Sequence, residues 1–141
     1  MAMSSIRKPV AFRLRSDTAA RLQRHAREVR ETQTSLVERY IEEGLRTDRH
    51  PAITFRAGAS GRRPSLLGTR LDLWQVIATI RQNDNSVARA AEYLGLSPER
   101  IQACLRYYAD YQDEVDDWAE RAQRIADREE ASARRQQELL A

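Results

Sequence analysis

The stretch that decides the N-terminal fold is residues 9–15, "PVAFRLR". Large apolar residues at every second position, namely Val10, Phe12 and Leu14, alternate with Ala11, Arg13 and Arg15. Alternation with a period of two predicts a half-buried β-strand. No second strand follows within hairpin distance, and a lone strand leaves its backbone donors and acceptors unpaired. The sequence therefore predicts that this strand pairs with another chain and leaves the arginine face open.

Two helices are expected after this strand. Ser16 is the expected N-cap of a first helix over 17–30, and Thr32 is the expected cap of a second helix over 33–46. The second helix carries an apolar stripe at helical spacing: Leu36, Val37, Tyr40, Ile41 and Leu45. A unit of only about 40 residues rarely buries enough apolar area to be stable alone. We therefore expect two copies to fold together.

This segment, "VAFRLRSDTAARLQRHAREVRETQTSLVERYIEEGLR", resembles the ribbon-helix-helix family of Arc-like, MetJ-like and CopG-like repressors. The resemblance lies in the spacing of the strand, both caps and both helical stripes. It implies an obligate homodimer whose two-stranded ribbon enters the DNA major groove. The chain departs from the family at Ala11, where a hydrogen-bonding side chain is usual. It also lacks a glycine in the loop "VRETQ", so no strained turn residue is expected there.

The resemblance also implies which residues of this segment contact DNA. Arg13 and Arg15 would donate to guanine O6 and N7, each contact worth roughly 1–3 kcal/mol of discrimination. The N-terminus of the second helix would direct backbone N–H groups at a phosphate. The expected DNA contacts here are Arg7, Lys8, Ala11, Arg13, Arg15, Thr32, Thr34 and Ser35. The alternative is that the strand arginines are only solvated charges.

The middle of the chain has a different organisation. His50-Pro51 breaks the chain, and the segment "AITFRAGASGRRPSLLGTR" predicts a β-hairpin or wing with its loop at 58–63. Asp72 is then the expected cap of a helix. The stretch "SVARAAEYLGLSPERIQACLRYY" follows, with Ser86 and Ser97 as caps and Gly95 between two helices. A helix, a glycine turn and a second helix at this spacing predict a helix-turn-helix motif.

If this motif docks as usual, the second helix lies in the major groove and its N-terminal residues meet base edges. The expected DNA contacts of the middle segment are Arg62, Arg63, Ser97, Arg100, Gln102 and Arg106. Glu99 and Asp110 weaken this interpretation because both would repel the DNA backbone. The alternative is a three-helix arrangement that is purely structural or serves dimerisation.

Residues 53–111 resemble a small bacterial family, the domain of unknown function 433. The residues that carry this resemblance are "ITFRAGASGRRPSLLGTRLDLWQVIATI", especially "GTRLDLWQVI", followed by the helix-turn-helix. It implies a winged-helix-like fold, dimerisation through this domain, and a role in antitoxins that sit beside a PIN-like ribonuclease toxin. Arg62-Arg63-Pro64 stands where the family usually has glycine-lysine-proline.

Residues 112–141 contain no glycine or proline, and their apolar spacing predicts that the preceding helix continues to about residue 130. The segment is acidic, and we expect it to dock on a basic toxin surface. The residues expected to bind this partner are Val115, Trp118, Ala122 and Ile125. The alternative is that Trp118 packs on the middle domain or on a second subunit. The acidic cluster at 113–117 lacks the glycine of a Ca²⁺ loop, so a solvated helix face is expected there.

The composition and charge of the chain disfavour several classes of protein. The net charge of +3 divides into +4 for residues 1–50, +3 for 51–112 and −4 for 113–141. One cysteine, Cys104, rules out a disulfide framework within the chain, and with only two histidines no metal or other cofactor is expected. No set of side chains typical of catalysis is present, so an enzyme is not expected. There is no apolar stretch of membrane-spanning length and no secretion-signal core, so we expect a cytoplasmic protein.

These observations predict a mostly α fold with short β segments. The expected domains are a ribbon-helix-helix dimerisation and DNA-binding domain at 1–50, a winged helix-turn-helix-like domain at 51–111 and an acidic helical tail at 112–141. The expected function is a sequence-specific, dimeric transcriptional repressor that serves as antitoxin and autoregulator of its operon. Its expected partners are operator DNA, a second copy (with tetramers also open) and a PIN-like toxin. The alternatives are a CopG-type regulator without a toxin and a protein-binding adaptor.

Overall fold

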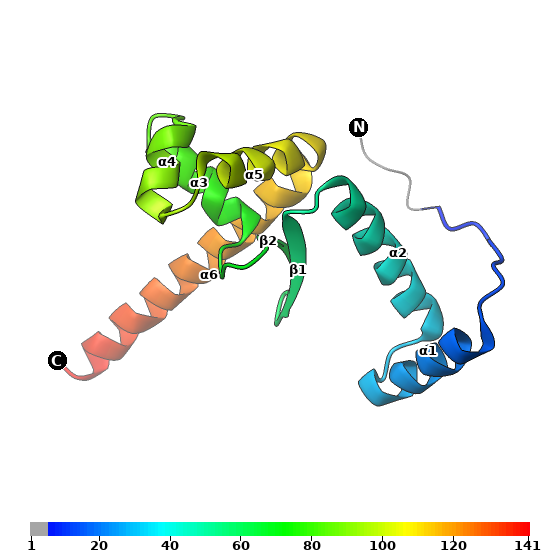
Figure 1. The fold of residues 1–141 in the computed structure, drawn as a ribbon. Coiled ribbons are helices and arrows are strands. Elements are labelled where there is room, and N and C mark those ends of the chain that lie inside the picture. Colours follow the sequence, from blue (N-terminus) through cyan, green and yellow to red (C-terminus); the bar gives the residue numbers. More distant parts are fainter. Residues whose placement is uncertain (1–5) are drawn as a thin grey trace. The chain divides into compact units, whose positions relative to one another are not determined.

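The computed structural model describes residues 6–141 (Figure 1). Its contacts divide the chain into two compact units, which we call the N-terminal unit, up to Glu42, and the C-terminal unit, Glu43–Ala141. The chain is mostly helical, with a two-stranded antiparallel sheet and a long C-terminal helix, which confirms the predicted fold class. The elements are α1 (Ser16–Val29), α2 (Gln33–Arg49), β1 (Ile53–Gly58), β2 (Gly61–Leu66), α3 (Leu73–Gln82), α4 (Val87–Leu94), α5 (Pro98–Asp110) and α6 (Gln112–Leu139).

The N-terminal unit contains α1 and the first part of α2. The Thr32 hydroxyl accepts a hydrogen bond from the Ser35 N–H at 3.1 Å, which confirms the predicted cap of α2. The predicted cap of α1 is wrong: Ser16 already lies inside the helix, and Arg15 precedes it without a side-chain cap. The turn after α1 holds Arg30 at φ 57°. A strained turn residue is therefore present, although no glycine marks its place.

The extended segment before α1 carries no strand in the single chain. This differs from the strand expected over 9–15. The physical reason is that the described residues offer this segment no second strand, and a strand exists only through hydrogen bonds to a neighbour. Its apolar side chains remain exposed, Phe12 at 72%. The expectation of a strand paired between two copies therefore remains a prediction.

The C-terminal unit begins with a β-hairpin. The strands β1 and β2 pair in register from Ile53↔Leu66 to Gly58↔Gly61. The turn lies at 59–60, so the loop is shorter than the expected 58–63. Gly61 has φ 118°, a conformation that side chains other than glycine rarely adopt.

Three short helices follow the hairpin, and their ends obey the local signals. The Ser86 hydroxyl accepts from the Arg89 N–H at 3.1 Å, and the Ser97 hydroxyl accepts from the Arg100 N–H at 3.4 Å. Gly95 ends α4 with φ 68°. The helices α4 and α5 thus form the predicted helix-turn-helix.

The long helix α6 is separate from α5, so the prediction of one helix continuing through Tyr111 is wrong. Tyr111 leaves the helical conformation at φ −132° and ψ 42°, and α6 begins at Gln112. The ring of Tyr111 packs on Tyr107 with centroids 4.7 Å apart. The change of direction lets Val115 enter the same core as α3 and α5. This core is apolar and consists of Ile53, Leu66, Leu73, Val76, Ile77, Ile80, Ala90, Ala91, Ile101, Cys104, Tyr107 and Val115.

The last turns of α2 belong to the C-terminal unit. Glu43 holds Arg62 of β2 through two hydrogen bonds of 2.6 and 2.7 Å. His50 lies 2.8 Å from Asp110, measured from Nε2 to Oδ2. These bonds place the boundary between the units inside α2, earlier in the chain than the expected boundary at 50. Among the described helices, none is both long and apolar enough to cross a membrane.

Candidate nucleic-acid interface

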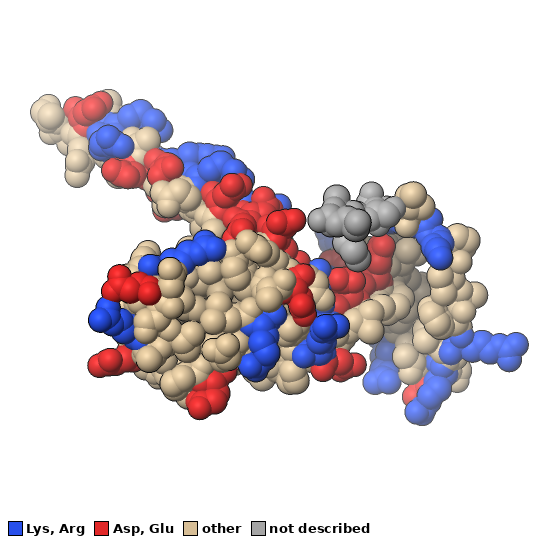
Figure 2. Space-filling model, turned by 90° about the horizontal axis from the view of Figure 1, so that it is seen from above, with Lys and Arg blue, Asp and Glu red and all other residues tan. Residues whose placement is uncertain are grey.

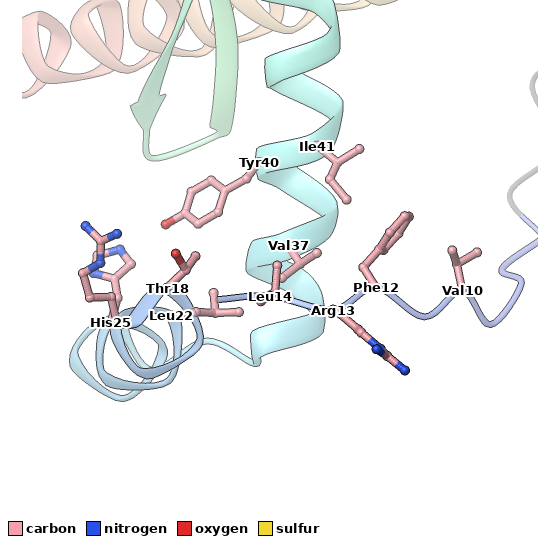
Figure 3. A pocket seen from close by; sticks show the side chains of 11 residues that line it. Val10, Phe12, Arg13, Leu14, Thr18, Leu22, His25, Val37, Tyr40 and Ile41 are labelled. Atoms are coloured by element: carbon pink, nitrogen blue, oxygen red, sulfur yellow. The ribbon is translucent and has the colours of Figure 1, made fainter. Parts of the chain in front are cut away.

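An apolar groove of about 880 Å³ lies in the N-terminal unit (Figure 3). Three sides contribute to it: the extended segment, α1 and α2. Its apolar lining consists of Val10, Phe12, Leu14, Leu22, Val37 and Ile41. Several of these side chains are more than half exposed, including Phe12. Burying one such side chain is worth about 1.5–3 kcal/mol, so covering the groove would stabilise the protein.

The extended segment directs its side chains to two sides. Figure 3 shows Val10 and Phe12 on the side that faces Ile41 of α2, whereas Arg13 points the opposite way. At these three positions the directions agree with the alternating sequence, although Arg13 also borders the groove. Nothing in the described part of the chain covers the arginine side.

The basic residues of this segment are all exposed. Arg15 lies 3.4 Å from Asp17, and Arg7 lies 3.6 Å from Glu38. Within residues 6–141, Arg13 forms no ion pair, and the same holds for Lys8. Ion pairs at such exposed positions contribute little and break easily. The segment therefore presents positive charge that phosphate can neutralise and N–H donors that guanine O6 and N7 can accept from.

The N-terminus of α2 lies in the same unit. Thr32, Thr34 and Ser35 are all exposed, and Thr32 bonds the N–H of Ser35. The remaining N–H groups of the first turn have no partner within the helix itself. They can donate to an anion such as a phosphate, and this contact stays a prediction.

In the hairpin, the two arginines expected to contact DNA are used inside the unit. Arg62 is held by Glu43, and Arg63 donates from Nε to Asp72 at 2.7 Å. Both guanidinium groups already have a carboxylate partner, and their contact with DNA stays a prediction. In the single chain these bonds tie the hairpin to α2 and to the start of α3.

The helix α5 presents a mixed surface. Arg100 donates to the carbonyl of Leu67, and Ser97 serves as cap, so both have structural roles. Of the expected contacts on this helix, Gln102 and Arg106 remain exposed. Glu99 is exposed beside them. The helix α5 has no net charge, because Glu99 and Asp110 balance its two arginines, and this disfavours a DNA-reading role.

Asp72, predicted only as a helix cap, is the centre of a polar cluster. Its carboxylate accepts from Arg56 at 2.8 Å, Arg63 at 2.7 Å and Ser65 at 3.0 Å. Trp74 also donates its indole N–H to Asp72 at 3.3 Å. The carboxylate therefore joins both strands to the start of α3. No sequence signal identifies these partners, because an arginine and an aspartate so far apart have no characteristic spacing.

A second cluster that the sequence does not reveal lies at the end of α2. Arg46 donates to Glu114 and, at 2.9 Å, to the hydroxyl of Tyr107, and its guanidinium lies 4.1 Å from the ring centroid of Tyr111. Burial alone would lower the pKa of Arg46, but the hydrogen bond and charge of Glu114 raise it above the ordinary value. Burial, together with Glu114, raises the pKa of Tyr107. Both groups therefore keep their protons, and the cluster holds α2, α5 and α6 together.

The residues expected to bind a partner through the tail have unequal accessibility. Val115 is 1% exposed, so its side chain is part of the core and not of a binding surface. Trp118 packs on the hairpin turn, because a Cβ added at Gly61 would lie 3.5 Å from its ring. This contact fits the alternative in which Trp118 packs on the middle domain. Ala122 is half-buried, and Ile125 is 43% exposed.

A comparison with known families decides the assignment of the middle segment. The family described as protein of unknown function, DUF433, matches residues 53–108. These residues are a DUF433 domain. The resemblance inferred from "GTRLDLWQVI" is thereby confirmed, and the DUF433 domain contains the hairpin, the Asp72 cluster and the helix-turn-helix.

The other comparisons add no relative. No curated protein and no solved structure is significantly similar to the chain. None of the comparisons supports a ribbon-helix-helix domain before the DUF433 domain. Within residues 6–141, no group of three or more metal-ligating side chains comes together.

Proposed function

We propose that the protein is a sequence-specific transcriptional repressor that binds operator DNA as a homodimer through an N-terminal ribbon-helix-helix. The observation that carries the proposal is the uncovered apolar groove of the N-terminal unit, together with Arg13, which points away from Val10 and Phe12. A second copy of the extended segment supplies what the single chain lacks: a partner strand for its backbone and apolar side chains for the groove. The arginine faces of the paired strands then form one surface of a width that fits the major groove.

The proposed regulatory role rests on the resemblance of the middle segment to antitoxin-type domains. We propose that the protein is the antitoxin and autoregulator of a toxin–antitoxin operon, with a PIN-like ribonuclease as the toxin. A repressor acts where the DNA is, so we place it in the cytoplasm. An open reading frame for such a ribonuclease beside this gene supports the proposal, and neutralisation of its toxicity by co-expression tests it.

One observation favours a second role for the DUF433 domain. Its hairpin arginines are already paired with Glu43 and Asp72, and α5 exposes Glu99 beside Gln102. We therefore propose that this domain contributes protein contacts, to a second copy or to the toxin, more than base contacts.

The experiment compares two variants by mobility shift on the protein's own promoter. The Arg13→Ala variant should lose about 1–3 kcal/mol of discrimination at one guanine in each half-site while remaining dimeric. The Phe12→Asp variant should become monomeric in sedimentation analysis, because a charge cannot be buried in the groove without a partner. If Arg13→Ala and Arg15→Ala leave operator affinity unchanged, the ribbon is not the DNA reader. If wild type is monomeric at micromolar concentration, the dimer proposal is wrong.

A further inference from the structure

The long helix α6 has a charge pattern that its net charge conceals. From Trp118 onward, four arginines recur at helical spacing, and we call them the arginine face: Arg121, Arg124, Arg128 and Arg135. At 3.6 residues per turn they fall within about 60° of one another around the axis. Between Trp118 and Leu139 no acidic residue falls within the same sector: Glu120, Asp127 and Glu138 lie to one side of it, Glu129 lies to the other side and Glu130 lies opposite. The face runs for about 21 Å along the helix.

The arginine face is open to solvent. In Figure 1, α6 extends beyond the body of its own unit, and in Figure 2 basic side chains gather in two groups along this projecting helix. Arg124, Arg128 and Arg135 are exposed and form no ion pair with any residue of 6–141. Arg121 is partly engaged, since it lies 2.8 Å from Asp117 and stacks over Trp118.

The spacing of the arginines along α6 lowers the stability of the projecting part of the helix. Arg124 and Arg128 are four residues apart, and like charges at that spacing destabilise a helix. The projecting turns also lack a packed apolar face that would compensate. A polyanion bound along the arginine face would offset the repulsion between these arginines.

The chemistry of the face fits phosphate. Arginine is always charged, and its planar fork binds phosphate oxygens through two hydrogen bonds. A membrane surface fits less well, because an interfacial helix needs bulky apolar residues along one side. Here the only large apolar residues beyond Trp118 are Ile125, Leu139 and Leu140.

We propose that the arginine face of α6 binds the phosphate backbone of duplex DNA without regard to sequence. This inference rests on the proposed function, because it adds a second, non-specific contact to a protein that reads its operator elsewhere. The tail would then fasten the protein to DNA, in addition to any partner that it binds.

The test measures binding of the full chain to a fluorescent random-sequence 30-base-pair duplex by anisotropy between 50 and 300 mM KCl. The triple variant Arg124→Gln, Arg128→Gln and Arg135→Gln should lower the slope of log K against log salt by about 2.7, at 0.9 per phosphate contact. Arg135→Gln alone should weaken binding up to about eightfold at 0.1 M salt, which follows from the same slope. Glutamine keeps the helix propensity, and circular dichroism verifies that α6 remains folded.

The matched control is Arg134→Gln, which removes the same charge at the neighbouring residue. Arg134 lies about 100° from Arg135 around the helix and 3.6 Å from Glu130, so its loss should weaken binding less than twofold. Equal effects at 134 and 135, or an unchanged slope in the triple variant, would overturn the inference. So would a triple variant that still binds DNA but no longer binds phosphatidylglycerol vesicles, because the face would then serve a membrane.

The failure of this inference is distinguishable from that of the proposed function. If Arg13→Ala and Arg15→Ala weaken DNA binding while the triple variant does not, the repressor proposal stands and the arginine face has no DNA role. If wild type binds no DNA at 50 mM salt, both proposals are wrong.

Discussion

Replacing Asp72 with asparagine tests how the DUF433 domain is held together. The substitution keeps the size of the side chain and its acceptor oxygen but removes the negative charge. Arg56 and Arg63 then share a partly buried site without a counter-ion. We expect the hairpin and the start of α3 to separate more easily, because Asp72 is their common partner.

The expected cost follows from the exposure of the groups. The Asp72 side chain is 9% exposed, and the side chains of Arg56 and Arg63 are 32% and 30% exposed. Removing one partner of a fully buried ion pair costs about 3–5 kcal/mol. Water reaches the two arginines, and Arg56 keeps its bond of 2.7 Å to the carbonyl of Arg70. We therefore expect a loss of about 2–4 kcal/mol in the free energy of unfolding.

Tryptophan fluorescence during urea unfolding is the appropriate assay. Both tryptophans of the chain, Trp74 and Trp118, lie in the C-terminal unit, so the signal reports on this unit alone. The control is Asp84→Asn, because Asp84 is 81% exposed and its pair with Arg89 should contribute less than about 1 kcal/mol. An Asp72→Asn variant within 0.5 kcal/mol of wild type, on the scale of an ordinary surface substitution, would refute the reasoning.

Three further predictions concern other positions of the fold. Burial raises the pKa of the Cys104 thiol to about 12 from about 9. The contribution of Cys104 to the free energy of unfolding should therefore be constant below pH 9 and fall between pH 9 and 12, as the difference between wild type and Cys104→Ala in denaturation series. Gly95→Ala should lower the free energy of unfolding by about 1–2 kcal/mol, because Gly95 has φ 68°, which strains any other residue even though its Cβ position is open. Gly44→Ala lies inside α2 and should raise the free energy of unfolding by about 0.5–1 kcal/mol. Thermal unfolding separates the two signs. Tyr107→Phe should cost about 1.5–3 kcal/mol in urea unfolding, because the hydroxyl lost lies between Arg46 and Glu114.

The sequence predicts what is decided locally. The caps at Thr32, Ser86 and Ser97 and the turn at Gly95 follow from residues within one helical turn, so their patterns identify them. The hairpin is found for the same reason, although its turn is shorter than expected.

The features that the sequence does not predict depend on partners that are distant in the chain or absent from it. Arg46 meets Glu114 across 68 residues of chain, and no spacing rule connects them. The break at Tyr111 is missed because the apolar spacing continues through it, while packing of the tyrosine ring decides the local conformation. The strand at 9–15 needs a neighbour that a single chain does not contain.

The position of the unit boundary inside α2 limits how evolution can recombine this gene. A crossover at the His50-Pro51 break would bring a foreign helix end and remove Glu43, Arg46 and His50 from their ion-pair partners. Only an exchange upstream of Glu43 transfers the DUF433 domain together with the α2 residues that form ion pairs with it. Homologous genes that carry a different front half should therefore retain these three residues or replace their partners together.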